Sequence, residues 1–100
     1  MAEKRKVVLT KLANEHITHI YQTLLQISDD EAEALMDDFL DTVFGDIPTF
    51  PEQFPICEGI KTQSNDYRIA HLVGHFRVIF QILKDRVLIL LILHESELPF

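Results

Sequence analysis

Arg68, Arg77 and His94 are the side chains of this sequence best suited to chemistry, and each lies within or at the end of an apolar run. An arginine can hold an anion through directed hydrogen bonds, and a histidine can exchange a proton near neutral pH. The same residue types also serve structure, because an arginine can pair with a carboxylate of its own chain and a histidine can hydrogen-bond the local backbone. The sequence leaves both interpretations open for all three residues.

Metal and cofactor chemistry is not indicated. His16 and His19 lie three residues apart on one predicted helix face beside Glu15, but no third ligand follows at a diagnostic spacing. No glycine-rich phosphate loop, G-x-S-x-G turn, CxxC pair or HExxH motif occurs. The sequence therefore predicts no bound metal and no cofactor.

The net charge of −7 is unevenly distributed along the chain. Residues 1–11 carry four Lys or Arg, whereas residues 12–58 carry none and hold eleven carboxylates, Asp37, Asp38 and Asp41 among them. An acidic stretch of this length repels phosphate, so direct nucleic-acid binding is not expected there. A solvated helix face is the simplest explanation of these charges.

Composition points to one globular domain over residues 1–100. About half of the chain, 47%, is apolar, which is enough for a single core. Cys57 is the only cysteine, so a disulfide framework is excluded and a cytoplasmic, reducing compartment is expected. The longest apolar run, residues 87–93, is far too short to span a membrane.

The first half of the chain predicts a short strand and two helices. The strand covers residues 5–9, and the first helix follows Thr10, with apolar residues recurring at three- and four-residue spacing. Ser28 with Glu31 forms a capping-box pattern that opens the second helix. Gly45 is expected to end that helix, since glycine favours the C′ position. The short link predicts an antiparallel helical hairpin.

The second half predicts a loop and three strands. Three prolines in residues 46–59 are expected to exclude helix and central strand from that segment. Strands are predicted over residues 67–72, 76–83 and 87–93, joined by tight turns. The continuous apolar run 87–93 indicates a central strand that is covered on both faces. The fold class is α+β, with the order β-α-α-β-β-β and the helical hairpin on a mostly antiparallel sheet.

The element order and several residues of the last segment, YRIAHLVGHFRVIFQILKDRVLILLILH, resemble the RelE/ParE superfamily of bacterial toxins, and the plasmid-stabilisation type in particular. The resemblance covers nearly the whole chain. Arg68, Gly74, Arg77, Val78 and His94 match recurring positions of the family pattern. It implies the toxin component of a type II toxin–antitoxin system, neutralised by a cognate antitoxin.

Two modes of action follow from the resemblance. ParE-like members inhibit DNA gyrase by binding it, whereas RelE-like members cut messenger RNA on the ribosome. Arg77 matches a functional arginine of the ribonuclease members, and His94 lies one residue before the catalytic histidine of some of them. The rest of their basic cluster is missing, and an acidic segment follows His94. Protein binding is therefore the preferred interpretation; a ribonuclease with Arg77 and His94 as catalytic residues, or an inactive relative that only binds a partner, is the alternative.

A partner-binding surface is predicted on both charged parts of the chain. Its candidate residues are Lys61, Arg68 and Arg77 on the basic side and Asp37, Asp38 and Asp41 on the acidic helix. Because no basic residue stands between Lys11 and Lys61, a docking segment on the second helix should carry Lys or Arg between apolar anchors. The resemblance also leaves a homodimer open.

Overall fold

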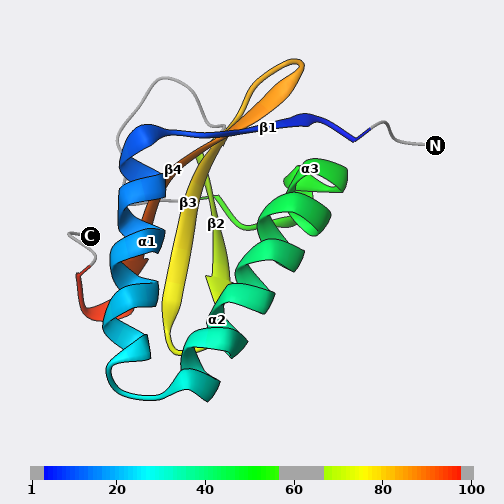
Figure 1. The fold of residues 1–100 in the computed structure, drawn as a ribbon. Helices are drawn as coiled ribbons and strands as arrows, with labels where there is room; N and C mark the ends of the chain where they lie inside the picture. Colours follow the sequence, from blue (N-terminus) through cyan, green and yellow to red (C-terminus); the bar gives the residue numbers. More distant parts are fainter. Residues whose placement is uncertain (1–3, 57–66, 98–100) are drawn as a thin grey trace.

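Two layers form the part of the chain that the computed structural model describes, residues 4–56 and 67–97: a four-stranded sheet and a pair of long helices on one of its faces (Figure 1). The elements follow one another as β1 (Lys6–Leu9), α1 (Lys11–Leu25), α2 (Asp29–Asp41), η1 (Thr42–Asp46), α3 (Ile47–Thr49), η2 (Pro51–Gln53), β2 (Tyr67–Leu72), β3 (Phe76–Ile82), β4 (Arg86–His94) and η3 (Glu95–Glu97). This order confirms the predicted α+β class. Cys57 and Lys61 lie outside the described residues.

The sheet has the strand order β1-β4-β3-β2. β1 runs parallel to β4, while β2, β3 and β4 are mutually antiparallel. The register between β3 and β4 shifts after Ile79: Ile79 pairs with Leu91, whereas Phe80 pairs with Ile89. Leu90 is therefore the additional residue of a β-bulge. β4 is thus an inner strand, as predicted.

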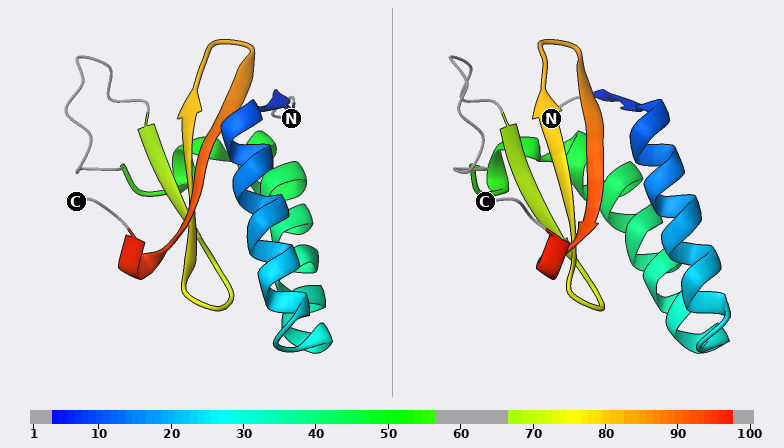
Figure 2. Two further views of the ribbon diagram at one scale, coloured as in Figure 1. Left: turned by 60° about the vertical axis from the view of Figure 1, so that its left-hand side comes forward. Right: turned by 90° about the vertical axis from the view of Figure 1, so that its left-hand side faces the viewer.

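The main core lies between the sheet and the helices, which stand on the same side of the sheet in both views of Figure 2. β4 contributes Val87, Ile89 and Ile92 to it, and each burial is worth about 1.5–3 kcal/mol before entropy is counted. The leucines between them are only half-buried, because no helix covers the opposite face among the described residues. The prediction that β4 is covered on both faces was therefore wrong. A small second cluster around Ile69 and Ile79 protects part of that face.

Both long helices begin at the predicted caps. The Thr10 hydroxyl accepts a hydrogen bond from Ala13 N at 3.2 Å and donates one to Ile89 O at 2.7 Å, which ties the start of α1 to β4. The Ser28 hydroxyl accepts from Glu31 N at 3.3 Å and opens α2. The helices form the expected antiparallel hairpin.

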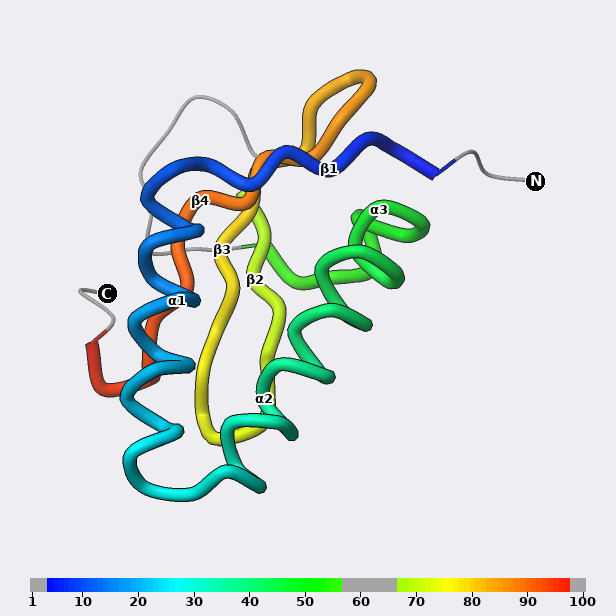
Figure 3. The backbone as a smooth tube through the Cα atoms, in the orientation of Figure 1, coloured from blue at the N-terminus to red at the C-terminus, as the bar shows by residue number. Residues whose placement is uncertain are grey.

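The end of the second helix differs from the prediction. The chain keeps winding past Gly45, through η1 and into α3, as the tube in Figure 3 shows, so Gly45 is not a C′ residue and part of the predicted loop 46–59 is helical. Pro48 has no N–H to donate and cannot continue an ordinary α-helix. The Ile47 N–H instead donates to Thr42 O five residues back, in a widened π-turn that lets the chain pass the proline.

Candidate functional site

Arg77 lies in β3 on the face of the sheet that the helices do not cover. Its neighbour Val78 is buried in the main core, and strand alternation turns the Arg77 side chain the other way. The guanidinium Nη2 donates to Glu95 Oε1 of η3 at 3.0 Å, and 26% of the Arg77 side chain is exposed. The positive charge of Arg77 is therefore paired within the chain.

His94 ends β4 and faces the helices. It stands opposite Phe76 in the register, with ring centroids 5.1 Å apart in an edge-on contact. Together with Phe76 it lines an apolar pocket of about 420 Å³. The pocket lies between the C-terminal end of α1, the N-terminal half of α2 and the β2–β3 turn. The His94 Nδ1 accepts a hydrogen bond from Ser96 N at 3.2 Å and lies 2.8 Å from the Ser96 hydroxyl. This side chain thus has the local backbone partner that the sequence analysis considered.

The structure does not bring the two predicted catalytic side chains together. Arg77 faces Leu93 across the sheet, one position before His94, and consecutive strand residues point to opposite faces. Arg77 lies on the open face, whereas His94 lies in a pocket lined by residues of α1 and α2. The two side chains therefore start from opposite faces of the sheet and have different partners, Glu95 for Arg77 and Ser96 for His94.

Glu95 and His75 form a small polar cluster with Arg77 that sequence reasoning did not predict. Glu95 Oε2 lies 3.5 Å from His75 Nδ1, and Glu95 N donates to His75 O at 2.8 Å. His75 has a φ of 66°, in the left-handed region that few residues other than glycine adopt. The acidic segment after β4 was visible in the sequence, but its position across from the β2–β3 turn depends on the sheet register.

Arg68 lies in β2 and is bound to the backbone of the preceding loop. Its Nη1 donates to Phe54 O at 2.9 Å and to Glu52 O at 3.2 Å. Its Nε is buried and has no acceptor among the described residues. This guanidinium holds the segment around η2 against the edge of the sheet, and the interpretation of Arg68 as a partner-binding residue stays a prediction.

The acidic candidates of α2 differ in their surroundings. Asp38 Oδ2 accepts a hydrogen bond from Val73 N at 2.8 Å, which connects α2 to the β2–β3 turn. Asp37 and Asp41 are exposed and take part in no ion pair among residues 4–56 and 67–97. Asp37 and Asp41 are thus available at the surface, while Asp38 already has a structural partner.

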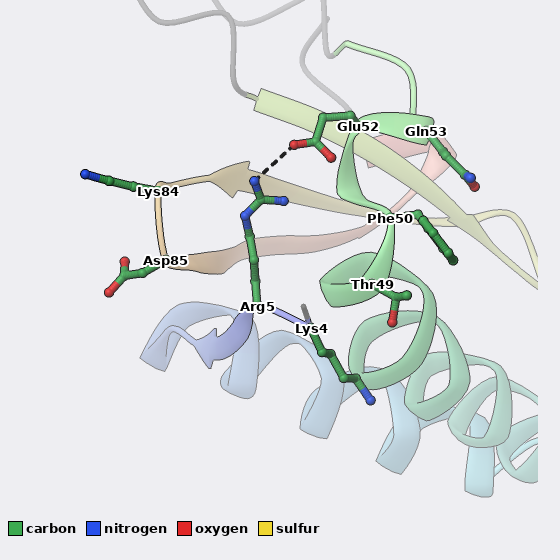
Figure 4. A pocket seen from close by; sticks show the side chains of 8 residues that line it. All are labelled: Lys4, Arg5, Thr49, Phe50, Glu52, Gln53, Lys84 and Asp85. Carbon is green, nitrogen blue, oxygen red and sulfur yellow. Dashed lines mark ion pairs between the residues drawn. The ribbon is translucent and has the colours of Figure 1, made fainter. Parts of the chain in front are cut away.

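A second depression, of about 1040 Å³, brings together charges that lie far apart in the sequence (Figure 4). Lys4 and Arg5 precede β1, Glu52 belongs to η2, and Lys84 and Asp85 form the β3–β4 turn. Arg5 points toward Glu52 and pairs with it at 3.2 Å, whereas Lys84 and Asp85 point outward. A hydrogen bond from its own backbone N–H and the nearby Arg5 lower the pKa of Glu52. The three cations face two carboxylates, so the depression has little net charge.

Neither a metal cluster nor a membrane-spanning helix occurs in the described part of the chain. Among the residues that the structure describes, no group of three or more His, Cys, Asp or Glu side chains gathers in a geometry that could hold a metal ion. His16 Nδ1 instead accepts a hydrogen bond from Ile92 N at 3.2 Å, beyond the end of the β1–β4 pairing. Within residues 4–56 and 67–97, no helix has the length and apolar character needed to cross a bilayer.

Comparison with solved structures supports the fold. The chain is similar to a protein of the RelBE2 toxin–antitoxin complex of Mycobacterium tuberculosis, with 17% identity, 92% and 99% coverage of the two chains and a TM-score of 0.61. It is also similar to a protein of the chromosomal ParDE system of P. aeruginosa, with 18% identity, 89% and 94% coverage and a TM-score of 0.67. A conserved hypothetical protein of Helicobacter pylori shares 19% identity, with 93% and 97% coverage and a TM-score of 0.57.

Comparison at the sequence level identifies the family. No curated protein matches the sequence significantly. The family model described as the ParE toxin of the type II toxin–antitoxin system parDE matches residues 7–99, which is almost the whole chain and includes both long helices and all of the sheet except Lys6. The chain therefore belongs to the ParE toxin family of type II toxin–antitoxin systems, within the RelE/ParE superfamily.

Proposed function

We propose that this toxin acts in the bacterial cytoplasm by binding a protein target, with DNA gyrase as the first candidate, and that a cognate antitoxin of a plasmid-stabilisation system neutralises it. The observation that carries this proposal is the separation of Arg77 and His94 on opposite faces of the sheet. Arg77 is neutralised by Glu95, and the ring of His94 is held by Ser96. RNA cleavage needs a cation and a proton-transferring group on the same phosphate, whereas inhibition by binding needs neither.

The antitoxin partner is supported by the family and by the complexes among the similar structures. The solved RelBE2 structure is a toxin–antitoxin complex, and the P. aeruginosa protein belongs to a ParDE toxin–antitoxin system. An antitoxin segment that folds on binding would lie along the helices and the sheet edge of this chain. The residues proposed to contact it are the six of the sequence prediction: Lys61, Arg68, Arg77, Asp37, Asp38 and Asp41.

The decisive experiment measures growth and two biochemical activities in parallel. Induction of the chain alone in a bacterial host should slow growth, with filamentation and a DNA-damage response. The purified protein should inhibit gyrase supercoiling and should leave ribosome-bound messenger RNA intact. Cleaved messages together with unaffected gyrase would contradict the proposal, and normal growth at high soluble expression would indicate an inactive relative.

Variants of the Arg77–Glu95 pair sharpen the distinction between binder and nuclease. Glu95→Gln removes the carboxylate that neutralises Arg77. In a nuclease this change should raise RNA cleavage, and Arg77→Ala or His94→Gln should abolish it; in a binder none of the three changes creates or removes cleavage. Arg86→Ala is the matched control, because Arg86 is an exposed arginine of the same sheet that pairs with its neighbour Asp85.

A further inference from the structure

An apolar row that is half-buried at Met36 and exposed at Leu40 and Phe44 runs along α2 and η1. Met36, Leu40 and Phe44 follow one another at four-residue steps, which places them in one row on a helix. Leu40 is 47% exposed and Phe44 42% exposed, whereas Leu35 and Phe39 of the same helix are buried against the sheet. Met36 is half-buried against the main core, and the ring of Phe44 lies edge-on to that of Phe39 at 6.3 Å, so both contribute to packing, whereas Leu40 and the outer side of Phe44 remain open to solvent.

An acidic row accompanies the apolar one. Glu33, Asp37 and Asp41 follow the same four-residue spacing on α2 and are all exposed. Like charges at this spacing destabilise a helix, and the whole of α2 carries no Lys or Arg that could offset them. None of the three carboxylates pairs with a cation within the two described ranges. The isolated chain therefore keeps a row of charges that costs it stability.

Gly45 adds an independent observation at the end of the apolar row. It is helical and has no positive φ, so its backbone does not require glycine. A Cβ built on Gly45 would meet no atom within 4 Å. Glycine inside a helix is less favourable than alanine, and here neither backbone strain nor packing within the chain explains it. The open space at Gly45 leaves room for another chain to approach the backbone closely.

We propose that this surface, made of Met36, Leu40 and Phe44 with the acidic row Glu33, Asp37 and Asp41 beside it, docks a basic amphipathic helix of a partner protein. The inference deepens the proposed function, since it states the chemistry of the partner that a binding toxin would meet. From Met36 to Phe44 the row extends over about 12 Å, or two helical turns, which suits a helix with apolar anchors three or four residues apart. Lys or Arg beside those anchors would face the unpaired carboxylates.

The negative charge of the surface favours a basic helix over two other binding partners, a second copy of this chain and an acidic peptide. A second copy of the chain would place another Glu33–Asp41 row opposite the first, at a net charge of −7 for each copy. An acidic peptide would meet the same repulsion. Only a positively charged segment relieves the unfavourable charges of α2 on binding.

The test uses the full chain and two synthetic peptides as probes. Both peptides are helical and carry the same leucine anchors; one has lysines beside the anchors and the other has glutamates. Fluorescence anisotropy at low and moderate salt should show that the lysine peptide binds at least tenfold more tightly than the glutamate peptide. Its affinity should fall as salt rises, since screening weakens exposed charge pairs.

Substitutions then assign the binding to this surface. Leu40→Ser should weaken the lysine peptide about tenfold, because it removes one buried leucine contact from the complex. The double change Asp37→Asn with Asp41→Asn should weaken it about threefold to tenfold and flatten the salt dependence. Ile27→Ser, at an exposed residue of the link between the helices, and Glu15→Gln, at an exposed carboxylate of α1, are the matched controls and should bind as the wild type does.

Three results would overturn the inference. They are equal binding of the two peptides, unchanged binding by folded Leu40→Ser, and a concentration-dependent dimer that Leu40→Ser abolishes, which would make the occupant a second copy. Circular dichroism of each variant separates lost binding from lost fold. Growth on induction tests the proposed function separately: arrested growth without peptide binding refutes only this inference, and peptide binding without arrest refutes only the toxin mechanism.

Discussion

Arg68 is predicted to stabilise the fold, and Arg68→Met tests this role. Methionine keeps much of the apolar stem but removes the guanidinium that donates to Phe54 O at 2.9 Å and to Glu52 O at 3.2 Å. A hydrogen bond from a charged donor contributes about 1.5–3 kcal/mol, and only the bond to Phe54 O is partly buried. The bond to Glu52 O is exposed and contributes little.

The substitution also removes the buried Nε, which has no acceptor in the described part of the chain, and this offsets part of the lost stability. The expected net change in the free energy of unfolding is about 2 kcal/mol, which lowers the Tm of a domain of this size by about 8–12 °C. Arg68→Lys keeps the charge without the planar guanidinium and should recover part of the loss.

Thermal melts followed by circular dichroism and urea titrations measure the change. Arg86→Met is the matched control. The Arg86 side chain is exposed and paired with its exposed neighbour Asp85, so the Tm of this variant should stay close to that of the wild type. An Arg68→Met variant that melts within 2 °C of the wild type, or about 0.5 kcal/mol, would refute the structural role. If such a variant also lost its partner, Arg68 would be a binding residue instead.

Three further predictions concern stability. Gly45→Ala should raise the free energy of unfolding by about 0.5–1 kcal/mol in a urea titration, because the added Cβ meets open space and alanine favours the helix; a lower value would mean that the π-turn itself requires glycine. Asp38→Ala should lower the free energy of unfolding by about 1 kcal/mol, because it removes the carboxylate that accepts a hydrogen bond from Val73 N in the β2–β3 turn. Asp37→Ala should change the free energy of unfolding little. Equal effects of the two substitutions in thermal melts would contradict the structural role of Asp38. The lowered pKa of Glu52 means that its ionised form stabilises the fold fully above its unfolded value of 4.5 and loses this effect as the pH falls through the folded pKa. Since 59% of the Glu52 side chain is exposed, Glu52→Gln should cost only a few tenths of a kcal/mol at pH 7 and nothing at pH 2, and a larger cost in acid would show that the sign is wrong.

The catalytic candidates of the alternative interpretation, Arg77 and His94, show that strand register decides which side chains share a face of the sheet. Arg77 lies in a predicted strand and His94 directly follows one, and both matched the family pattern. Their separation follows from the antiparallel register, in which Phe76 and not Arg77 stands opposite His94. Register depends on pairing between segments that are distant in sequence, and a shift of one residue exchanges the two faces.

Local signals in this chain determined the elements themselves. The capping box at Ser28, the helical spacing of apolar residues and the apolar run of β4 act over a few residues, so the sequence alone predicted the fold class, the element order and the inner position of β4. The same local reasoning was wrong at Gly45 and Pro48, because the π-turn of η1 and the short helix α3 carry the winding past both residues. Only the tertiary structure decided which face of β4 the helices cover, which carboxylate pairs with Arg77, and which carboxylates of α2 stay free of an ion pair among the described residues. These outcomes depend on packing between distant segments, which periodicity and spacing along one chain do not encode.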